Sequence, residues 1–461
     1  MKKILIAGAS GFIGKYLIES LLESTDHQII ALSRREKESN NPRLIWKKCD
    51  LFSVYEIEQV LEGVDSVFYL VHSMQPSARL DQASFIDYDL ILSDNFGRAA
   101  RKCNVKKVIY LSGIIPKNEN LSKHLLSRLE VEDVLKEYFE EFSILRAGLI
   151  LGKDGSSFNI LANLVKRLPV VICPYWAENV TSPVHFSIVI DSLIACLDDK
   201  HNGHTLDLSS RDNVSYFKLL ELTANSLGLK RIFLKFPYNI NYISRLWVSF
   251  FSGASKRLVY PLLESLSHDM APRVGHQIPI DSKMNVEQAI DLVVKESEGY
   301  KYEFSTYSVK RKTVRSVQRF ILPTEMNAKD LAKEYMAWLP KFLSPLVLIE
   351  IKDEKWVYFS LFHNRLRLLT LILSDERSTD DRQLFYIKGG LLASKNDKGR
   401  LEFRSVLNNK YALGAIHEFK PALPWYIYRY TQAIAHLFVM EAFNRHLLKI
   451  SKDNKKWLQK S

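Results

Sequence analysis

Three glycines near the N-terminus form the first pattern that could do chemistry. A short apolar run at residues 4–7 is followed by Gly8, Gly11 and Gly14. A strand, a glycine turn and a helix in this order present backbone N–H groups and the positive end of the helix dipole to an anion. The pattern predicts a turn that binds the pyrophosphate of a dinucleotide. The residues expected to contact it are Gly8, Ser10, Gly11, Phe12, Ile13 and Gly14.

The end of the second apolar run indicates which dinucleotide is bound. Residues 28–32 are typical of a buried strand, and Ser33, Arg34 and Arg35 follow it. An acidic residue at this position holds the ribose 2′-hydroxyl of NAD, whereas guanidinium groups bind a 2′-phosphate. We therefore expect NADP(H) as the preferred cofactor, with NAD(H) as the alternative. The two arginines could instead be a solvated edge of the protein.

Further candidate residues stand where later strands are expected to end. Apolar runs alternate with helical patterns up to about residue 148, which predicts an α/β Rossmann fold, a doubly wound parallel sheet with helices on both faces. Ligands of such sheets bind at the carboxyl ends of the strands. The cofactor contacts predicted there, and on a later helix, are Asp50, Leu51, Leu70, Val71, His72 and Arg128.

Ser112 stands at the end of an expected strand, and His124 and Arg128 stand on the helix expected after it. Histidine titrates near neutral pH, so His124 could act as a general acid. Arginine keeps its proton, so Arg128 could bind ribose or phosphate but could hardly carry a proton. The alternative for His124 is a surface residue in the first turn of the helix.

These residues resemble the atypical and extended short-chain dehydrogenase/reductase families. The resemblance rests on the glycine spacing, on Leu111-Ser112-Gly113, on residues 145–148 and on residues 182–185 followed by Asp191. Within these families the chain is similar to the NmrA-like nucleotide sensors and to the nucleotide-binding accessory subunit of respiratory complex I. The resemblance covers residues 1–298 and implies a substrate subregion at about residues 151–295.

One departure from these families bears on activity. Their reductases use a Tyr-x-x-x-Lys pair, and in register this chain has His124 and Arg128. Ser112 stands where the families place a catalytic serine or threonine, so the resemblance implies Ser112, His124 and Arg128 as the candidates for catalysis. Two functions therefore stay open. The first is an NADP-dependent oxidoreductase acting on an apolar carbonyl or quinone-like substrate. The second is a non-catalytic dinucleotide-binding sensor or scaffold.

The pattern changes after a polar segment at residues 299–313, which we interpret as a linker. A strand at 314–322, a helix at 327–342, six short strands and one long helix at about 425–449 are expected next. This α+β order resembles the helix-grip fold of the START and plant-allergen superfamily, over residues 314–461. The resemblance implies a cavity for an apolar small molecule. The aromatic residues of the last helix are expected to be core.

Composition limits the partners. The net charge of +12 suits an anionic partner, but no nucleic-acid-binding motif is present, so nucleic acid is not expected. The four cysteines lack metal or redox spacing, which predicts no metal site and a cytoplasmic location. The aromatic and basic segment 240–266 predicts an amphipathic helix covering the domain. A helix lying on the inner face of the membrane, or the mouth of an apolar substrate pocket, is the alternative. The oligomeric state stays open.

Overall fold

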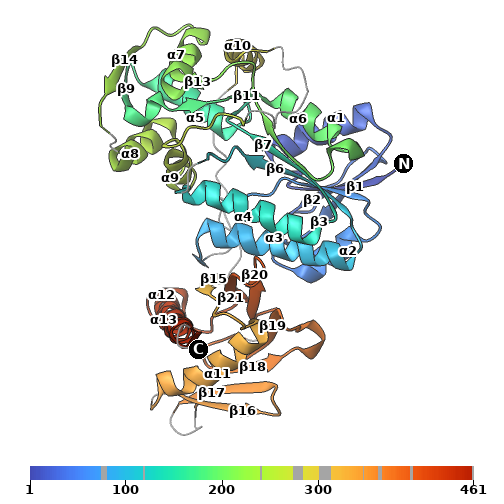
Figure 1. Cartoon of the computed structure of the whole chain (residues 1–461), viewed down its shortest axis with the longest axis vertical. Coiled ribbons are helices and arrows are strands. Elements are labelled where there is room, and N and C mark those ends of the chain that lie inside the picture. Colours follow the sequence, from blue (N-terminus) through green and yellow to red (C-terminus); the bar gives the residue numbers. More distant parts are fainter. Residues whose placement is uncertain are drawn as a thin grey trace. The chain divides into compact units, whose positions relative to one another are not determined.

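The chain forms two compact units (Figure 1). The first comprises Met1–Gln75 with Leu92–Thr306, and the second comprises Pro76–Ile91 with Tyr307–Ser461. Residues 301–312, most of the expected linker, lie outside the described part of the chain. The computed structural model describes residues 1–73, 80–117, 120–238, 241–273, 284–300, 313–345, 347–361, 366–394 and 398–458.

A seven-stranded parallel sheet organises the first unit, in the order β12-β7-β6-β4-β1-β2-β3. Central strands such as β1 and β4 are almost entirely buried, as parallel strands covered on both faces must be. The predicted doubly wound sheet is confirmed. Its strands are β1 (Lys3–Ala7), β2 (Gln28–Ser33), β3 (Leu44–Lys48), β4 (Ser66–Tyr69), β6 (Lys107–Gly113), β7 (Glu141–Ala147) and β12 (His204–Leu208).

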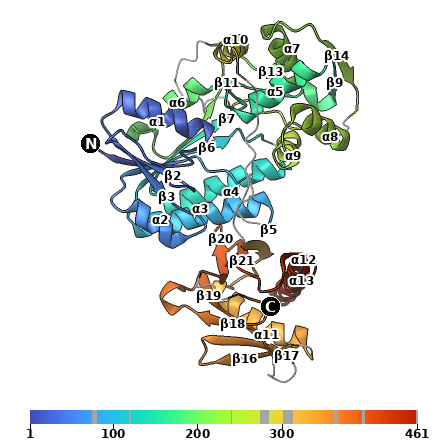
Figure 2. The ribbon, with the colours of Figure 1, turned by 180° about the vertical axis from the view of Figure 1, so that it is seen from behind.

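Helices cover both faces of this sheet (Figures 1 and 2). Helices α1 and α6 bury their apolar side chains in one layer with the sheet, and α2, α3 and α4 do so in a second layer on the opposite face. Every strand therefore ends between two helical layers, at an edge where loops meet. The helices are α1 (Phe12–Ser24), α2 (Val54–Leu61), α3 (Phe85–Lys102), α4 (Lys123–Tyr138) and α6 (Phe186–Ala195).

The expected substrate subregion is a smaller assembly with its own apolar core, to which α5, α7, α10 and β9 contribute. The segment predicted as one amphipathic helix is two helices, α8 and α9, because Gly253 between them has a positive φ of 77°. Its elements are β8 (Ile150–Leu151), α5 (Ser156–Arg167), β9 (Val170–Pro174), η1 (Tyr175–Glu178), β10 (Val180–Thr181), β11 (Val184–His185), β13 (Val214–Ser215), α7 (Tyr216–Ser226), β14 (Ile232–Phe236), α8 (Asn241–Ser252), α9 (Lys256–Ser265) and α10 (Val286–Glu296). The short helix η2 (Asp199–His201) contacts β6 and β7 of the parallel sheet instead.

The second unit is built on an eight-stranded sheet in the order β16-β17-β18-β19-β20-β21-β15-β5. Strand β5 pairs in parallel with β15, and the other neighbours are antiparallel. A strand, a helix, six strands and a helical end follow one another as expected, while the helix-grip assignment stays a prediction. The elements are β5 (Leu80–Gln82), β15 (Val314–Ile321), α11 (Ala328–Leu343), β16 (Leu348–Lys352), β17 (Trp356–Leu361), β18 (Leu366–Leu373), η3 (Asp375–Arg377), β19 (Arg382–Gly389), β20 (Arg400–Val406), β21 (Tyr411–Phe419), α12 (Trp425–Tyr430) and α13 (Gln432–Leu458).

The expectation of one long final helix with a core of aromatic residues needs correction. The helix is interrupted at Thr431, whose φ of −124° and ψ of −85° are not helical. Tyr428 and Met440 are buried in the core of this unit. Tyr426 and Tyr430 are 70% and 68% exposed. The aromatic residues therefore lie on both sides of these helices.

Aromatic rings fill the space between α11, α13 and the sheet. The ring of Tyr335 lies 5.0 Å from that of Phe403 and 4.9 Å from that of Phe443, and Trp338 lies 5.2 Å from Phe443. Such contacts add stability beyond the burial of apolar area. This part of the unit is packed as a core.

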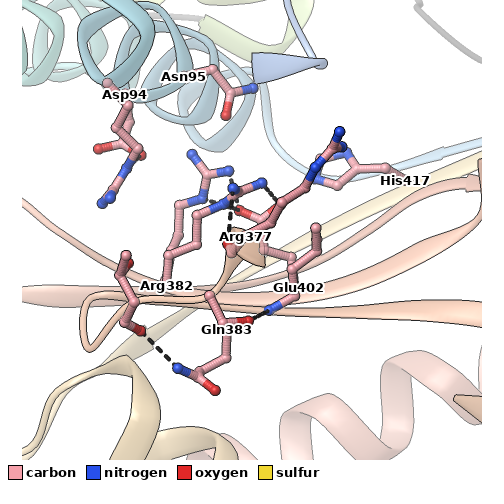
Figure 3. A network of polar contacts seen from close by, with 12 residues as sticks. Asp94, Asn95, Arg377, Arg382, Gln383, Glu402 and His417 are labelled. Atoms are coloured by element: carbon pink, nitrogen blue, oxygen red, sulfur yellow. Dashed lines mark hydrogen bonds and ion pairs between the residues drawn. The ribbon is translucent and has the colours of Figure 1, made fainter. Parts of the chain in front are cut away.

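A buried carboxylate lies among arginines on β19 and β20 (Figure 3). Arg382 donates hydrogen bonds to both oxygens of Glu402, at 3.1 and 3.2 Å, and Arg404 donates a third. Burial alone would raise the pKa of Glu402, but the two guanidinium groups hold that pKa well below its usual range. Glu402 is therefore ionised and links two neighbouring strands.

Acid is expected to destabilise the first unit through His185, the N-cap of α6. The His185 side chain is 1% exposed and accepts a hydrogen bond from the backbone N–H of Ser187. Burial lowers its pKa to about 4. Between pH 6.5 and 4 the unfolded chain binds a proton here that the folded chain does not, so stability falls as pH falls. At pH 5 this loss should be about 2 kcal/mol.

Chemical unfolding at pH 7 and pH 5, followed by circular dichroism, measures this loss. A His185→Asn variant keeps a capping acceptor without the titration, so it should lose about 2 kcal/mol less than the wild type between these pH values. An exposed control, His204→Asn, should behave as the wild type does. Equal losses in all three proteins would show that His185 is not the group responsible.

Candidate functional site

The turn between β1 and α1 has the geometry that the glycine spacing predicts. Gly8 has a φ of +94°, which side-chain-bearing residues rarely adopt, and a Cβ there would lie 2.7 Å from the carbonyl oxygen of Leu70. The N–H of Gly11 donates to the carbonyl of Gly8 at 2.9 Å. A Cβ on Gly14 would lie 2.5 Å from the Gly8 oxygen. The turn requires glycine at positions 8 and 14.

The first turn of α1 suits an anion. Its N-cap, Gly11, has no side chain to accept the N–H groups of that turn, and these groups carry the positive end of the helix dipole. Ser10 is exposed beside them, while Phe12 and Ile13 are half-buried. The ring of Phe12 lies against Gly152. A pyrophosphate group fits this arrangement of donors.

The end of β2 presents two cations beside this turn, because β1 and β2 are neighbours in the sheet. Ser33 is buried, and its Oγ accepts a hydrogen bond from the backbone N–H of Arg35 at 3.1 Å. Arg34 and Arg35 are exposed. Two guanidinium groups at this edge fit a phosphate on the ribose 2′ position.

The loops after β3 and β4 lie at the same edge of the sheet. The carboxylate of Asp50 accepts a hydrogen bond from the backbone N–H of Phe52 at 3.2 Å, and Asn95 of α3 donates to the carbonyl of Leu51 at 2.9 Å. These bonds hold the loop after β3 in place. Leu70, Val71 and His72 follow β4 and are half-buried. The structure thus brings together the residues predicted to hold the cofactor.

Ser112 lies at the end of β6, and its side chain is buried. Its hydroxyl donates to Glu132 at 2.7 Å. Arg146 donates two further hydrogen bonds to the same carboxylate, at 2.9 and 2.6 Å. Ser112 therefore completes a buried ion pair between α4 and β7, and its catalytic role stays a prediction. Glu132 was not anticipated from the sequence.

His124 is placed by a contact that the sequence did not signal. Its Nδ1 lies 3.1 Å from the Oγ of Ser265, which closes α9. Ser265 in turn lies 2.9 Å from the Oγ of Ser122, the N-cap of α4. The imidazole is half-buried, with its centroid 5.4 Å from that of His72. His124 thus stands in the first turn of α4, as expected, and contacts α9.

Arg128 lies one helical turn after His124, on the same face of α4. Its Nη1 donates to the hydroxyl of Tyr110 on β6 at 3.2 Å. The half-buried guanidinium is thereby held beside the sheet. His124 and Arg128 thus lie on one face of α4, where the parallel sheet meets the substrate subregion.

The described part of the chain contains neither a cluster of metal-binding side chains nor a helix that could span a membrane. Within the ranges given above, no three His, Cys, Asp or Glu side chains gather in a way that could hold a metal ion. No helix in that part of the chain is both long enough and apolar enough to cross a bilayer.

The strand order, the glycine turn and the polar residues at the carboxyl ends define a nucleotide-binding Rossmann domain. Residues 4–133 match the model of the NAD dependent epimerase/dehydratase family. This part of the chain is therefore similar to the extended short-chain dehydrogenases/reductases. The match does not reach residues 307–461, which make up most of the second unit.

Relatives with curated descriptions match part of the chain. The auxiliary protein GraX of Staphylococcus aureus is 35% identical over 123 residues, which is 26% of this chain and 39% of GraX. A UDP-glucose 4-epimerase of Rickettsia conorii is 26% identical over 228 residues, or 45% of this chain and 65% of the epimerase. The chain thus spans less than two thirds of either relative.

Solved structures share the fold at low identity. Triphenylmethane reductase of Citrobacter sp. complexed with NADP(H) has a TM-score of 0.51 at 14% identity, covering 63% of this chain and 99% of the reductase. A nucleoside-diphosphate-sugar epimerase of Staphylococcus aureus has a TM-score of 0.51 at 13% identity, covering 63% of this chain and all of that chain. Both likenesses support the fold.

The Ser112–Glu132–Arg146 cluster is expected to act on stability. Glu132→Gln would leave Arg146 buried without its counter-charge, which should lower the free energy of unfolding by about 3–5 kcal/mol. Ser112→Ala removes one hydrogen bond and should cost about 1 kcal/mol. Urea unfolding measures both changes, with dinucleotide binding as a second readout. A Ser112→Ala variant that keeps its stability but no longer binds dinucleotide would contradict this assignment.

Proposed function

We propose that this protein binds NADP(H) and reduces an apolar carbonyl or quinone-like substrate, with His124 as the proton donor. The observation that carries the proposal is the position of His124. In sequence register it stands where the reductases that the chain resembles have tyrosine. Its contact with Ser265 holds it at the junction with the substrate subregion. The bound dinucleotide supplies the hydride.

The preference for the phosphorylated cofactor rests on the end of β2. Arg34 and Arg35 are exposed there, and Arg34 stands directly after the strand, where an acidic residue would hold a ribose 2′-hydroxyl. Guanidinium groups bind phosphate through paired hydrogen bonds. Triphenylmethane reductase, which shares the fold, was crystallised with NADP(H). NAD(H) is the alternative cofactor.

The residues of α4 have separate tasks in this proposal. His124, protonated, gives its proton to the oxygen that becomes negative as the carbonyl is reduced. Ser265 holds the ring through Nδ1 and so fixes its orientation. Arg128 stays charged and binds the ribose or phosphate of the cofactor. The four cysteines are free thiols, which suits a reducing cytoplasm.

A second candidate is a dinucleotide-binding sensor or scaffold without turnover, as in the NmrA-like resemblance. Two observations favour it. The tyrosine and lysine of the reductases are replaced by His124 and Arg128, and the relative at 35% identity is described as an auxiliary protein. In this case the second unit would be the part that binds an apolar molecule.

Charge reversal at Arg34 tests the cofactor. Arg34→Glu should weaken NADPH binding at least about tenfold, because a charge-assisted contact to the 2′-phosphate is lost and a repulsion is added. NADH binding should change by less than about twofold. Fluorescence titration measures both, with the exposed Arg257→Glu as the control for net charge. Equal weakening for the two cofactors would overturn the 2′-phosphate assignment.

Removal of the imidazole tests the chemistry. His124→Ala should lower the turnover of NADPH with quinone and aromatic-carbonyl acceptors by roughly 10²–10⁴-fold, as loss of a general acid does. NADPH binding should be kept, and the exposed control His204→Ala should keep both. Tight NADPH binding by the wild type without turnover on any acceptor would favour the sensor instead.

A further inference from the structure

Strands β9 and β14 expose one apolar face. They pair in parallel, with Val170 beside Ile232 and Ile172 beside Leu234. Alternate residues of a strand point to opposite sides, and on one side Val171 and Cys173 of β9 are buried in the core. The side chains of the other side form what we call the β9–β14 face. Their exposed fractions are Val170 40%, Ile172 48%, Ile232 60%, Leu234 51% and Phe236 37%.

An aliphatic surface of this kind needs an explanation. Single apolar residues are common on protein surfaces, but contiguous ones mark sites of interaction. Here the strand register makes the five residues neighbours on one small sheet. The face therefore points to an apolar partner.

Basic side chains gather at one end of the face. Lys166 and Arg167 precede β9, and Lys230 and Arg231 precede β14. Parallel pairing brings these two basic pairs to the same end, as a hydrogen bond of 3.1 Å from the N–H of Ile232 to the carbonyl of Pro169 shows.

Arg231 and Arg167 are held there by backbone carbonyls. Arg231 donates to the carbonyls of Val165 and Lys166, at 2.6 and 3.2 Å, and Arg167 donates to that of Phe251 at 2.8 Å. Carbonyl groups carry no net charge, so these bonds fix the guanidinium groups without neutralising them.

Aromatic residues border the opposite end of the face. Tyr175 and Tyr238 follow the two strands and are 60% and 68% exposed. Tyr175 and Phe236 help to line a shallow hollow there. The nearby Glu178 is paired with Lys235 at 2.9 Å. Tyrosine at the rim of an apolar surface is typical of proteins at a membrane interface.

Helix α8 packs on α5 and α9. The bond between Arg167 and Phe251 joins its end to α5, and both ribbon views show α8 at the outer edge of the first unit (Figures 1 and 2). Phe250 of α8 is 78% exposed, while Trp247 and Phe251 pack inward.

We propose that the β9–β14 face docks on the surface of a lipid bilayer that contains anionic phospholipids. The aliphatic side chains would enter the boundary between headgroups and acyl chains, and the four basic residues would contact lipid phosphates. A second copy of the chain is a poorer partner. In a dimer with a two-fold axis, the basic end of each face would lie against the opposite end of the other copy's face, where the carboxylate of Glu178 is already paired with a lysine. Single-stranded nucleic acid binds to aromatic platforms, whereas four of the five side chains of the β9–β14 face are aliphatic.

Vesicle flotation of the full chain tests the proposal. The wild type should bind vesicles of phosphatidylcholine with phosphatidylglycerol, and bind phosphatidylcholine alone more weakly. Ile172→Ser with Leu234→Ser should weaken binding at least about tenfold. The matched control is Ile321→Ser with Ile351→Ser, on strands β15 and β16, at sites that are 46% and 48% exposed. This control should bind as the wild type does.

The charge component has its own pair of variants. Lys230→Glu should weaken binding to the anionic vesicles roughly fivefold or more and reduce its salt dependence, whereas Lys333→Glu, an exposed site on α11, should not. NADPH binding by every variant reports that the first unit is folded.

Three results would overturn the proposal. The first is a wild type that binds neither kind of vesicle. The second is equal binding by the two double serine variants. The third is a wild type that forms a dimer in analytical ultracentrifugation, does not bind vesicles, and becomes a monomer only when Ile172 and Leu234 are replaced. The β9–β14 face would then be an interface between two copies of the chain.

Discussion

The close approach of Gly14 to the carbonyl oxygen of Gly8 is the contact on which the site depends. It lets α1 begin directly after β1, with its uncapped N–H groups at the carboxyl edge of the sheet. A second close approach, of Phe12 to Gly152, joins the same turn to the substrate subregion. Two contacts that exclude side chains therefore set the position of the dinucleotide relative to the rest of the first unit.

Helix α4 distributes three tasks along its length. His124, Arg128 and Glu132 are spaced by four residues and so share a face. The first meets the substrate subregion through Ser265, the second bonds to Tyr110, and the third anchors the helix to Arg146. The buried ion pair of Glu132 with Arg146 fixes α4 against β7, and so fixes the position of the first turn of α4, where His124 stands.

Local patterns predicted most of the elements. The glycine turn and the individual strands depend on residues that are close in sequence. The start of α11 does so too, because Asn327 and Asp330 form a capping box in which each side chain accepts a hydrogen bond from the other's backbone N–H. The partners of Ser112 and His124 come from distant segments, so no spacing could reveal them. The exposed face of β9 and β14 also escaped prediction, because apolar residues on both sides of a strand are equally typical of complete burial.

Strand β5 comes from the N-terminal part of the chain but belongs to the sheet of the second unit. Gln82 accepts a hydrogen bond from Ser316, 234 positions later, and its strand closes one side of β15. A fragment that began at the linker would leave β15 as an open edge, with backbone groups ready to pair with another molecule. The sheet of the second unit thus includes a strand from the N-terminal part of the chain. Dividing the chain at one position would therefore not give two complete domains.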